Sequence, residues 1–283
     1  LWDEIEEQPY QTVNIADDLL IDCFDSEQIN QSLIPQQKIY SAGYGNYGKP
    51  VFFLADLESQ TRVDDYTLYV CGHEYARELA APPGMSGDRK IFIRKQSLKR
   101  FIWEKVEESS WYGKDNPLAR ALAFYDFKNA TETSLEQMSS LEADTVLYHE
   151  IGEIHTDQLL GQGWNEMLMQ LPRSQAEFMF RAIKDHIADA ISTLPRLVEN
   201  NDPAQIHFYF ANLSGMRREI FPGLMATYHQ WKDSQDPHIL RNLTDYSLQH
   251  WQRLARQLLT TFESRGLSAL ADIELMVKKH YLT

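Results

Sequence analysis

The spacing of apolar residues changes near residue 116, and no other feature of the sequence constrains the fold as strongly. Between about residues 36 and 95, short β-branched and aromatic runs alternate with turn residues, a pattern that is typical of strands. Beyond residue 116, apolar residues recur at helical intervals, which indicates amphipathic helices. The sequence therefore predicts an α+β fold, with a small mixed α/β domain over residues 1–115 and a mostly α-helical bundle over residues 116–283.

Turn residues bound the elements that are predicted in the first domain. The glycine- and proline-containing stretches at residues 43–50 and 82–87 indicate loops. Ser97 offers an N-cap for a helix that ends near Glu107. The runs between these signals predict strands at Lys38–Tyr40, Val51–Leu54, Tyr66–Val70 and Ile91–Arg94.

Capping residues mark the helices of the second domain. Ser174 and Glu177 form a capping box, which is a signal for a helix N-terminus. Asp202 and Asp236 each precede a proline, as an N-cap precedes a proline in the first helical position. The predicted helices run from about Ser134 to Gly161, from Ser174 to Thr193, from Asp202 onward, from Asp236 to Gly266 and from Ser268 to Tyr281.

The composition is that of a protein with a core of its own. The chain has 283 residues, of which 43% are hydrophobic, so it can bury a sizeable core without disulfides. Cys23 and Cys71 have no metal-ligand spacing, and we expect them to be core thiols in a reducing compartment. A cytoplasmic protein is therefore expected.

Charge and hydropathy disfavour two classes of partner. The chain has 27 Lys and Arg against 41 Asp and Glu residues, a net charge of −14, which repels phosphate backbones and disfavours nucleic-acid binding. No run reaches about 18 apolar residues, as a membrane-spanning helix requires. The first residues are acidic, whereas a signal peptide begins with basic ones. Neither a membrane span nor export is expected.

One segment of the first long helix has metal-binding chemistry. Residues 146–153 read Val-Leu-Tyr-His-Glu-Ile-Gly-Glu, and a glycine inside a helix costs up to about 1 kcal/mol relative to alanine. We expect Gly152 to mark the close approach of another backbone, because that is the usual reason for such a glycine. The stretch resembles the zinc helix of zincin metallopeptidases, whose HExxH motif often reads HEIGH.

This resemblance covers about eight residues and implies a role for each polar side chain. His149 would be a metal ligand, Glu150 the general base on the metal-bound water, and Glu153 a carboxylate ligand in place of the second histidine of the family. Helix geometry permits this arrangement, because His149 and Glu153 lie within about 40° of each other and Glu150 points about 100° away. His155 lies about 240° from His149 and is excluded.

The second helix contains Asp185-His186-Ile187-Ala188-Asp189, which resembles the glutamate-x-x-x-aspartate helix of gluzincins. The resemblance implies that Asp185 is the third ligand and that Asp189 supports the ligands from behind, with His186 or Asp189 as alternative ligands. Because adjacent helices of a bundle pack together, we expect His149 and Glu153 to converge with at least one of Asp185, His186 and Asp189.

A metal held by one histidine and two carboxylates lowers the pKa of its water, and Glu150 could accept the proton during attack on a carbonyl. These motifs predict a metal-dependent hydrolase of amide or ester bonds, acting on a small-molecule or peptide substrate. Zinc is the first expectation for the divalent metal, and manganese or iron also suits an oxygen-rich ligand set.

The same residues also have a structural interpretation. Asp185 and Asp189 lie opposite the apolar stripe of their helix, as on a solvated acidic face, and the pair of His149 and Glu153 could be purely structural. The helical domain would then be a non-catalytic structural or partner-binding module. The basic segment of residues 89–105 is either a partner surface or a solvated edge. A di-iron carboxylate site is disfavoured, because the second half lacks Glu-x-x-His.

Overall fold

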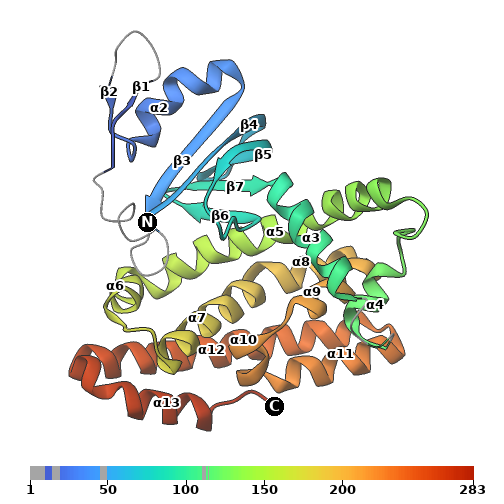
Figure 1. Ribbon diagram of the computed structural model, residues 1–283. Helices are drawn as coiled ribbons and strands as arrows, with labels where there is room; N and C mark the ends of the chain where they lie inside the picture. Colours follow the sequence, from blue (N-terminus) through green and yellow to red (C-terminus); the bar gives the residue numbers. More distant parts are fainter. Residues whose placement is uncertain (1–9, 15–19, 45–49, 110–112, 114) are drawn as a thin grey trace.

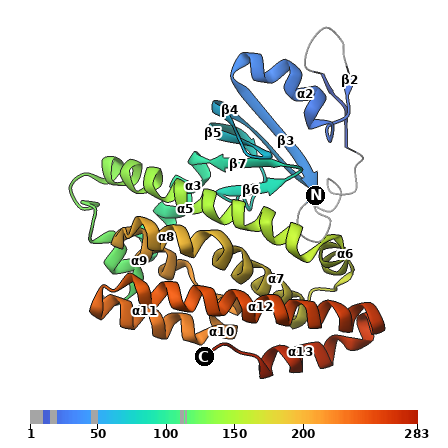
Figure 2. The same cartoon turned by 180° about the vertical axis from the view of Figure 1, so that it is seen from behind.

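The computed structural model describes residues 10–14, 20–44, 50–109, 113 and 115–283. A sheet-containing part is followed by a mostly helical part (Figure 1), as the sequence predicts. In both views of the chain, α5 (Thr131–Leu160) runs between the sheet and the remaining helices (Figures 1 and 2). This long helix therefore joins the two parts.

The five-stranded sheet has the order β3-β4-β5-β7-β6, in which only β5 and β7 are parallel neighbours. The four predicted strands are all present; three are extended by four residues or more and the last, β7, by one, because cross-strand pairing continues into the flanking residues. A further short ladder joins β1 (Val13–Asn14) to β2 (Leu20–Ile21), and α2 (Ser26–Leu33) packs on β3. The sheet strands are β3 (Lys38–Tyr44), β4 (Pro50–Val63), β5 (Tyr66–Arg77), β6 (Gly84–Gly87) and β7 (Lys90–Arg94).

The loop prediction for residues 82–87 is wrong for Gly84–Gly87, which form the edge strand β6 and pair with β7, whereas Pro82 and Pro83 lie outside the strands. A Cβ at Gly84 would lie 2.5 Å from Oε1 of Glu150 on α5. Glycine is thus required by close packing of a strand against a helix, and not by a turn. In the other predicted loop, Gly43 belongs to β3, and residues 45–49 lie outside the described residues.

Helix α3 (Lys95–Ser109) begins before Ser97, so the predicted N-cap is wrong. The hydroxyl of Ser97 instead donates to both carboxylate oxygens of Glu74, at 2.8 and 2.9 Å. Glu74 is a buried carboxylate that also pairs with Arg94. The hydroxyl of Ser97 thus binds a carboxylate that is distant in the sequence and does not cap the N-terminus of α3.

The helical part contains the predicted caps. The side chains of Ser174, Asp202 and Asp236 each accept hydrogen bonds from backbone N–H groups at the first turn of a helix. The helix that begins at Ser174 continues past Ala188 as a π-helical turn, Asp189–Thr193, and the chain enters the next helix directly at Leu194. The predicted helix end at Thr193 is therefore wrong, because a proline in the first turn of a helix is tolerated. The helices are α4 (Pro117–Leu122), α5, α6 (Gln162–Gln170), α7 (Gln175–Ala188), α8 (Leu194–Asn200), α9 (Pro203–Asn212), α10 (Gly215–Ile220), α11 (Pro222–Ser234), α12 (Pro237–Arg265) and α13 (Leu270–Lys279).

Helix α5 is covered on two sides by apolar contacts. Leu147, Ile151 and Ile154 pack against Ile91 and Ile93 of the sheet. On its other side α5 contacts α7 and the π-helical turn, which belong to the large core of the helical part. Polar side chains at the α5–α7 interface are therefore held between two rigid helices, which is the setting of a well-positioned site.

Gly152 marks a close approach of backbones, as predicted. A Cβ at this position would lie 2.8 Å from the carbonyl carbon of Ala188 and closer still to its oxygen. The absence of a side chain lets α5 and the end of α7 touch through their main chains. This contact lies one residue from Glu153 on one helix and from Asp189 on the other.

None of the helices in the described residues combines the length and the apolar composition that a membrane-spanning helix needs.

Candidate metal centre

Three of the side chains predicted to bind metal converge between α5 and α7. His149, Glu153 and Asp185 each offer one ligand atom, and these atoms lie within 4.8 Å of one another. His149 and Glu153 are one helical turn apart, so they share a face of α5, and Asp185 reaches them from α7. We refer to these three residues as the His149 cluster.

Asp189 holds the ring of His149 from behind. Its Oδ1 lies 2.9 Å from Nδ1 of His149, and its Oδ2 accepts hydrogen bonds from the hydroxyl of Tyr209 at 2.7 Å and from Arg217. Burial raises the pKa of Asp189, but Arg217 and His149 outweigh burial and hold it below its usual range. An ionised Asp189 therefore fixes Nδ1 of His149 as the protonated nitrogen.

The other ring nitrogen of His149 faces the cluster. Nε2 lies 4.0 Å from Oε1 of Glu153. Burial lowers the pKa of His149, but the contacts with Asp189 raise it to about 9. A metal ion would have to displace the Nε2 proton, as metals do when they bind histidine.

Glu153 is shared between the cluster and a cation. Its Oε2 lies 2.7 Å from Nζ of Lys184, which also reaches Asp157 at 2.9 Å. The Oε1 atom faces His149, so one carboxylate oxygen is anchored by Lys184 while the other points into the cluster. This arrangement leaves Glu153 able to act as a monodentate ligand.

Asp185 is the least restrained member of the cluster. Within the described part of the chain, the nearest cationic group to its carboxylate is Nε of Arg217, at 3.7 Å, which is beyond hydrogen-bond distance. Burial raises the pKa of Asp185, with Arg217 and His149 acting in the opposite direction. A partly buried carboxylate with no close donor is a group that a cation would stabilise.

Glu150 points to a different place, into a cavity of about 310 Å³ that it shares with His149, Asp189 and Arg217. We call this cavity the α5 pocket; its other walls come from β6, α3, the π-helical turn and α9. Glu150 is 8% exposed, and burial raises its pKa, with His149 and Ser86 acting in the opposite direction. A carboxyl whose pKa is raised toward neutrality is suited to exchange protons with a substrate.

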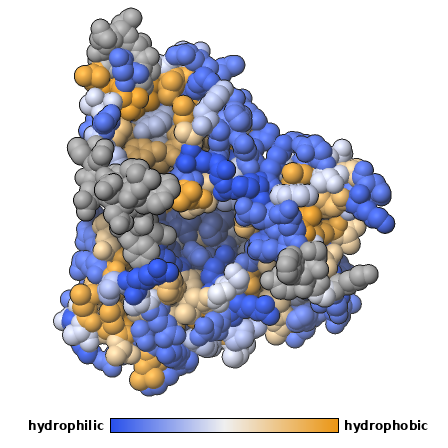
Figure 3. Space-filling view, in the orientation of Figure 1, coloured by the Kyte–Doolittle hydropathy of each residue, from blue (hydrophilic) through white to orange (hydrophobic). Residues whose placement is uncertain are grey.

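His149 connects this cavity to the cluster. Its ring lines the α5 pocket, whereas Glu153 and Asp185 do not. The side chains of the cluster are 29%, 17% and 32% exposed for His149, Glu153 and Asp185, so an ion in solution can reach them. On the face shown in Figure 3, the surface is hollowed between the sheet and the helices and is mostly hydrophilic around the hollow.

The comparisons with known proteins place the chain in a family. Residues 1–94 match the N-terminal domain, and residues 99–280 the C-terminal domain, of a family of unknown function, DUF6866. The chain belongs to the DUF6866 family. No curated protein and no solved structure matches it. The boundary between the two DUF6866 domain models falls at the start of α3.

Two further histidines of this DUF6866 protein, on α5 and α7, do not belong to the His149 cluster. His186, an alternative ligand in the sequence prediction, is buried, and its Nε2 lies 2.8 Å from the carbonyl oxygen of Arg217. Its ring stacks on Trp251, with 5.2 Å between ring centroids, so it faces the helical core. His155 is exposed and is not part of the cluster.

The sequence prediction missed three residues that surround the cluster. Tyr209 and Arg217 bind Asp189, and Lys184 binds Glu153. Lys184 adjoins Asp185 in the chain, but Tyr209 and Arg217 come from α9 and α10 and carry no motif. Their polar contacts arise only because these helices pack against the end of α7.

Most cations of the basic segment of residues 89–105 form ion pairs in the described structure, and the exposed Arg89 is not among them. Arg94 is buried with Glu74 and Glu78, and five further cations pair with acidic side chains on other elements or on the same helix. These pairs are Lys90 with Glu27, Lys95 with Glu58, Lys99 with Glu136, Arg100 with Glu104 and Lys105 with Glu108. The segment therefore fits a paired, solvated edge better than an anion-binding surface.

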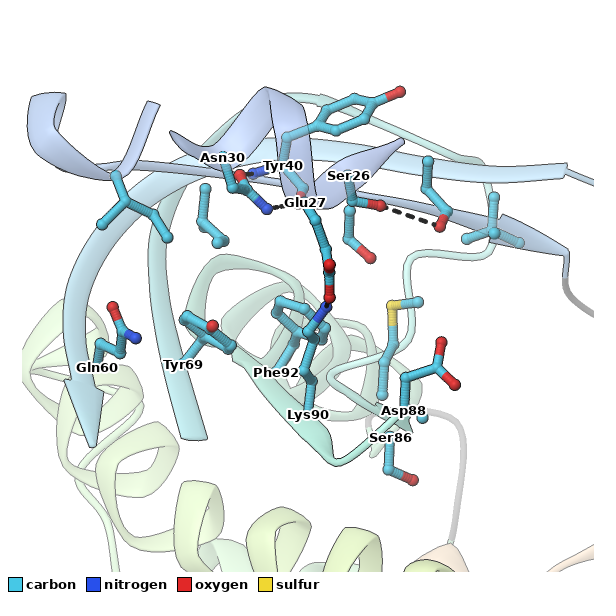
Figure 4. Close-up of a pocket in the computed structure, with 18 of the residues that line it drawn as sticks. Ser26, Glu27, Asn30, Tyr40, Gln60, Tyr69, Ser86, Asp88, Lys90 and Phe92 are labelled. Atoms are coloured by element: carbon cyan, nitrogen blue, oxygen red, sulfur yellow. Dashed lines mark hydrogen bonds and ion pairs between the residues drawn. The ribbon is translucent and has the colours of Figure 1, made fainter. Parts of the chain in front are cut away.

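A larger cavity, of about 660 Å³, lies under α2 in the sheet-containing part (Figure 4). Two of its polar side chains have partners within the protein: the amide of Asn30 binds the backbone of Tyr40, and Glu27 pairs with Lys90 at 3.1 Å. Tyr69 and Phe92 stack along its wall. Among the described residues, this cavity has no cluster of metal ligands.

Proposed function

We propose that this protein is a metal-dependent hydrolase of amide or ester bonds, with a divalent ion held by His149, Glu153 and Asp185. The observation that carries the proposal is the hydrogen bond between Asp189 and Nδ1 of His149. Metal-binding histidines almost always donate their second N–H to a carboxylate or carbonyl, which fixes the ring and directs the other nitrogen at the metal.

The residues present fit such an ion. The cluster combines one imidazole with two carboxylates, a set that binds zinc and also suits manganese or iron. Asp185 has no close donor within the described residues, so an ion would supply its missing partner. Lys184 and Arg217 compensate part of the negative charge around the cluster but leave room for a cation.

The chain's own groups would divide the work of hydrolysis. A divalent ion at this position would supply Lewis-acid activation of water and of a carbonyl oxygen. Glu150 would accept the proton of the attacking water and later deliver it to the leaving group. Asp189 would keep His149 oriented, and the α5 pocket would hold the substrate next to both residues.

The resemblance to zincins supports the same assignment. His149, Glu150 and Glu153 lie on α5, while Asp185 lies on α7 and Asp189 in the π-helical turn that follows it, in the order that the gluzincin motifs imply. The presence of Glu153 in place of a second histidine, and its contact with Lys184, are the points at which this chain departs from that pattern.

A second candidate is a non-catalytic helical module in which these groups form a structural ion-pair network. It is favoured by the pairing of Glu153 with Lys184 and of Asp189 with Arg217. In this alternative His149 stays protonated and, together with Lys184 and Arg217, pairs with the carboxylates as a third cation. The two candidates differ in whether the folded protein contains metal.

We expect the wild-type protein to contain about one divalent metal ion per chain and His149→Ala to contain none, because only an oriented imidazole completes the ligand set. The measurement is elemental analysis of protein purified without nickel affinity. Adding zinc should raise the midpoint of thermal unfolding of the wild type but not of the variant, since a metal stabilises the state that binds it.

The matched control is His155→Ala, which removes an exposed histidine from the same helix and should leave the metal content unchanged. Equal metal content in wild type and His149→Ala, or no metal in either after reconstitution with zinc, manganese and iron, would leave the structural network as the better account.

A further inference from the structure

Three oxygen atoms in the α5 pocket lack a hydrogen-bond partner within the described residues. They are Oε1 of Glu142, Oγ1 of Thr193 and Oδ1 of Asn212. Glu142 and Thr193 are 2% and 1% exposed, so bulk water reaches neither side chain freely. The three side chains come from α5, the π-helical turn and α9, and they meet at the walls of a single cavity.

Such a group of unpaired atoms is energetically unfavourable unless a ligand completes it. A buried polar group that is left without a partner costs about 1–3 kcal/mol, and native structures contain few of them. The amide nitrogen of Asn212 donates to the carbonyl oxygen of Phe208 at 3.0 Å. This bond orients the amide and leaves its oxygen as the free acceptor.

The chemistry of the three oxygens specifies a donor-rich ligand. A carboxylate and an amide oxygen accept hydrogen bonds, and a hydroxyl can accept one too, whereas a primary ammonium offers three N–H donors and no acceptor. Apolar side chains such as Leu98 and Phe208 form part of the pocket wall, and the charged or polar side chains of His149, Glu150, Asp189 and Arg217 form another part. Its volume of about 310 Å³ lies at the small end of the usual range for ligand sites.

We infer that the α5 pocket recognises a primary ammonium group on a small apolar body, with Glu142, Asn212 and Thr193 accepting its three N–H hydrogen bonds. As a substrate class this rests on the proposed function, because His149 and Glu150 on the same wall would then act on an amide or ester bond in the bound amine.

The electrostatic setting agrees with a cationic ligand. Burial raises the pKa of Glu142 well above its ordinary value; the side chain of Thr145 acts in the opposite direction, and the charges of Asp202 and Asp144 act in the same direction as burial. An ammonium ion would stabilise the carboxylate form and make charge-assisted hydrogen bonds, which are stronger than neutral ones. No cation of the described residues forms an ion pair with Glu142, so this role is open to a ligand.

The structural alternative is that Glu142 serves the core through Tyr125. The hydroxyl of Tyr125 is also buried without a partner, and after burial the charge of Glu142 is the next cause that raises the pKa of Tyr125. Tyr125 does not line the α5 pocket. Substituting Tyr125 therefore separates a core role of Glu142 from a role in recognition.

The experiment is calorimetric titration of the full chain with phenethylamine and with 2-phenylethanol, which has the same size but carries no ammonium. We expect the wild type to bind the amine at least about tenfold more tightly than the alcohol, as expected for hydrogen bonds to charged groups. Glu142→Gln should abolish this preference, and Thr193→Val should weaken it severalfold. Tyr125→Phe should leave it unchanged.

Thermal unfolding of the same variants supplies an independent readout. Glu142→Gln should keep or raise the unfolding midpoint, because it replaces a buried carboxyl whose ionisation burial disfavours, and Thr193→Val should do the same because it removes a buried hydroxyl without a partner. Equal affinity for amine and alcohol in the wild type, or an unchanged preference in Glu142→Gln, would overturn the inference. A preference lost in Tyr125→Phe together with a lowered midpoint would assign Glu142 to the core instead.

Binding is measured without turnover, on protein treated with a chelator and on untreated protein. Absence of metal would therefore count against the hydrolase proposal alone, while loss of amine selectivity would count against this pocket assignment alone.

Discussion

Gly152→Ala should destabilise the protein, although the same change stabilises most helices. Alanine is favoured over glycine by up to about 1 kcal/mol inside a helix, but here the added methyl group would meet the carbonyl group of Ala188. Forcing apart two packed backbones costs about 1–3 kcal/mol or more. After the gain in helix propensity is subtracted, denaturant unfolding should show a net loss of up to about 2 kcal/mol, and Gly152→Leu should show a larger loss.

Gly163→Ala is the matched control, because a Cβ at this position of α6 would lie 3.5 Å from its nearest neighbour, an ordinary contact. That variant should be neutral or slightly stabilising. If Gly152→Ala were as stable as Gly163→Ala, α5 and α7 would not be in main-chain contact. The relative placement of Glu153 and Asp189 would then need revision.

Glu150→Gln should abolish most hydrolytic activity while leaving metal and fold in place. The amide keeps the size of the side chain but cannot accept a proton, and loss of a positioned general base lowers the rate by about 10² or more. Burial raises the pKa of Glu150, so the folded state disfavours its charge. The neutral amide should therefore not lower the unfolding midpoint.

Activity for this comparison is read with p-nitroanilides and p-nitrophenyl esters of apolar amino acids. These carry a scissile bond, an apolar body and an ammonium group. Glu166→Gln, at an exposed position of α6, is the control and should be silent. Full activity in Glu150→Gln would remove Glu150 from the mechanism, and a lowered unfolding midpoint with unchanged metal content would indicate a structural role.

The helical part was predictable because its signals are local. A serine or aspartate cap, a proline in the first turn and a terminal glycine each act within a few residues, and the caps at Ser174, Asp202 and Asp236 are where the sequence places them. The strand β6 was not predictable, since Gly84 and Gly87 have low strand propensity; they pair with β7, and α5 packs closely against Gly84. The π-helical turn at Asp189 carries no local signal either.

The candidate site likewise has one part that could be predicted from local sequence signals and another that depends on tertiary packing. The positions of His149, Glu153, Asp185 and Asp189 relative to their own helices follow from helical periodicity. Their convergence depends on Gly152, which is the residue that allows the two helices to touch. Arg217 and Tyr209 could not be predicted, because a basic or phenolic side chain on a later helix has no sequence feature that identifies its acidic partner.

The most direct measurement of the central claim is anomalous diffraction at the zinc edge from crystals grown with zinc. The account predicts a single strong peak between Nε2 of His149 and the carboxylates of Glu153 and Asp185, at about 2.0–2.2 Å from each ligand atom. Asp189 should remain hydrogen-bonded to Nδ1. If no peak appears at saturating zinc, and Lys184 remains paired with Glu153 and Arg217 with Asp185, the proposed metal site is contradicted.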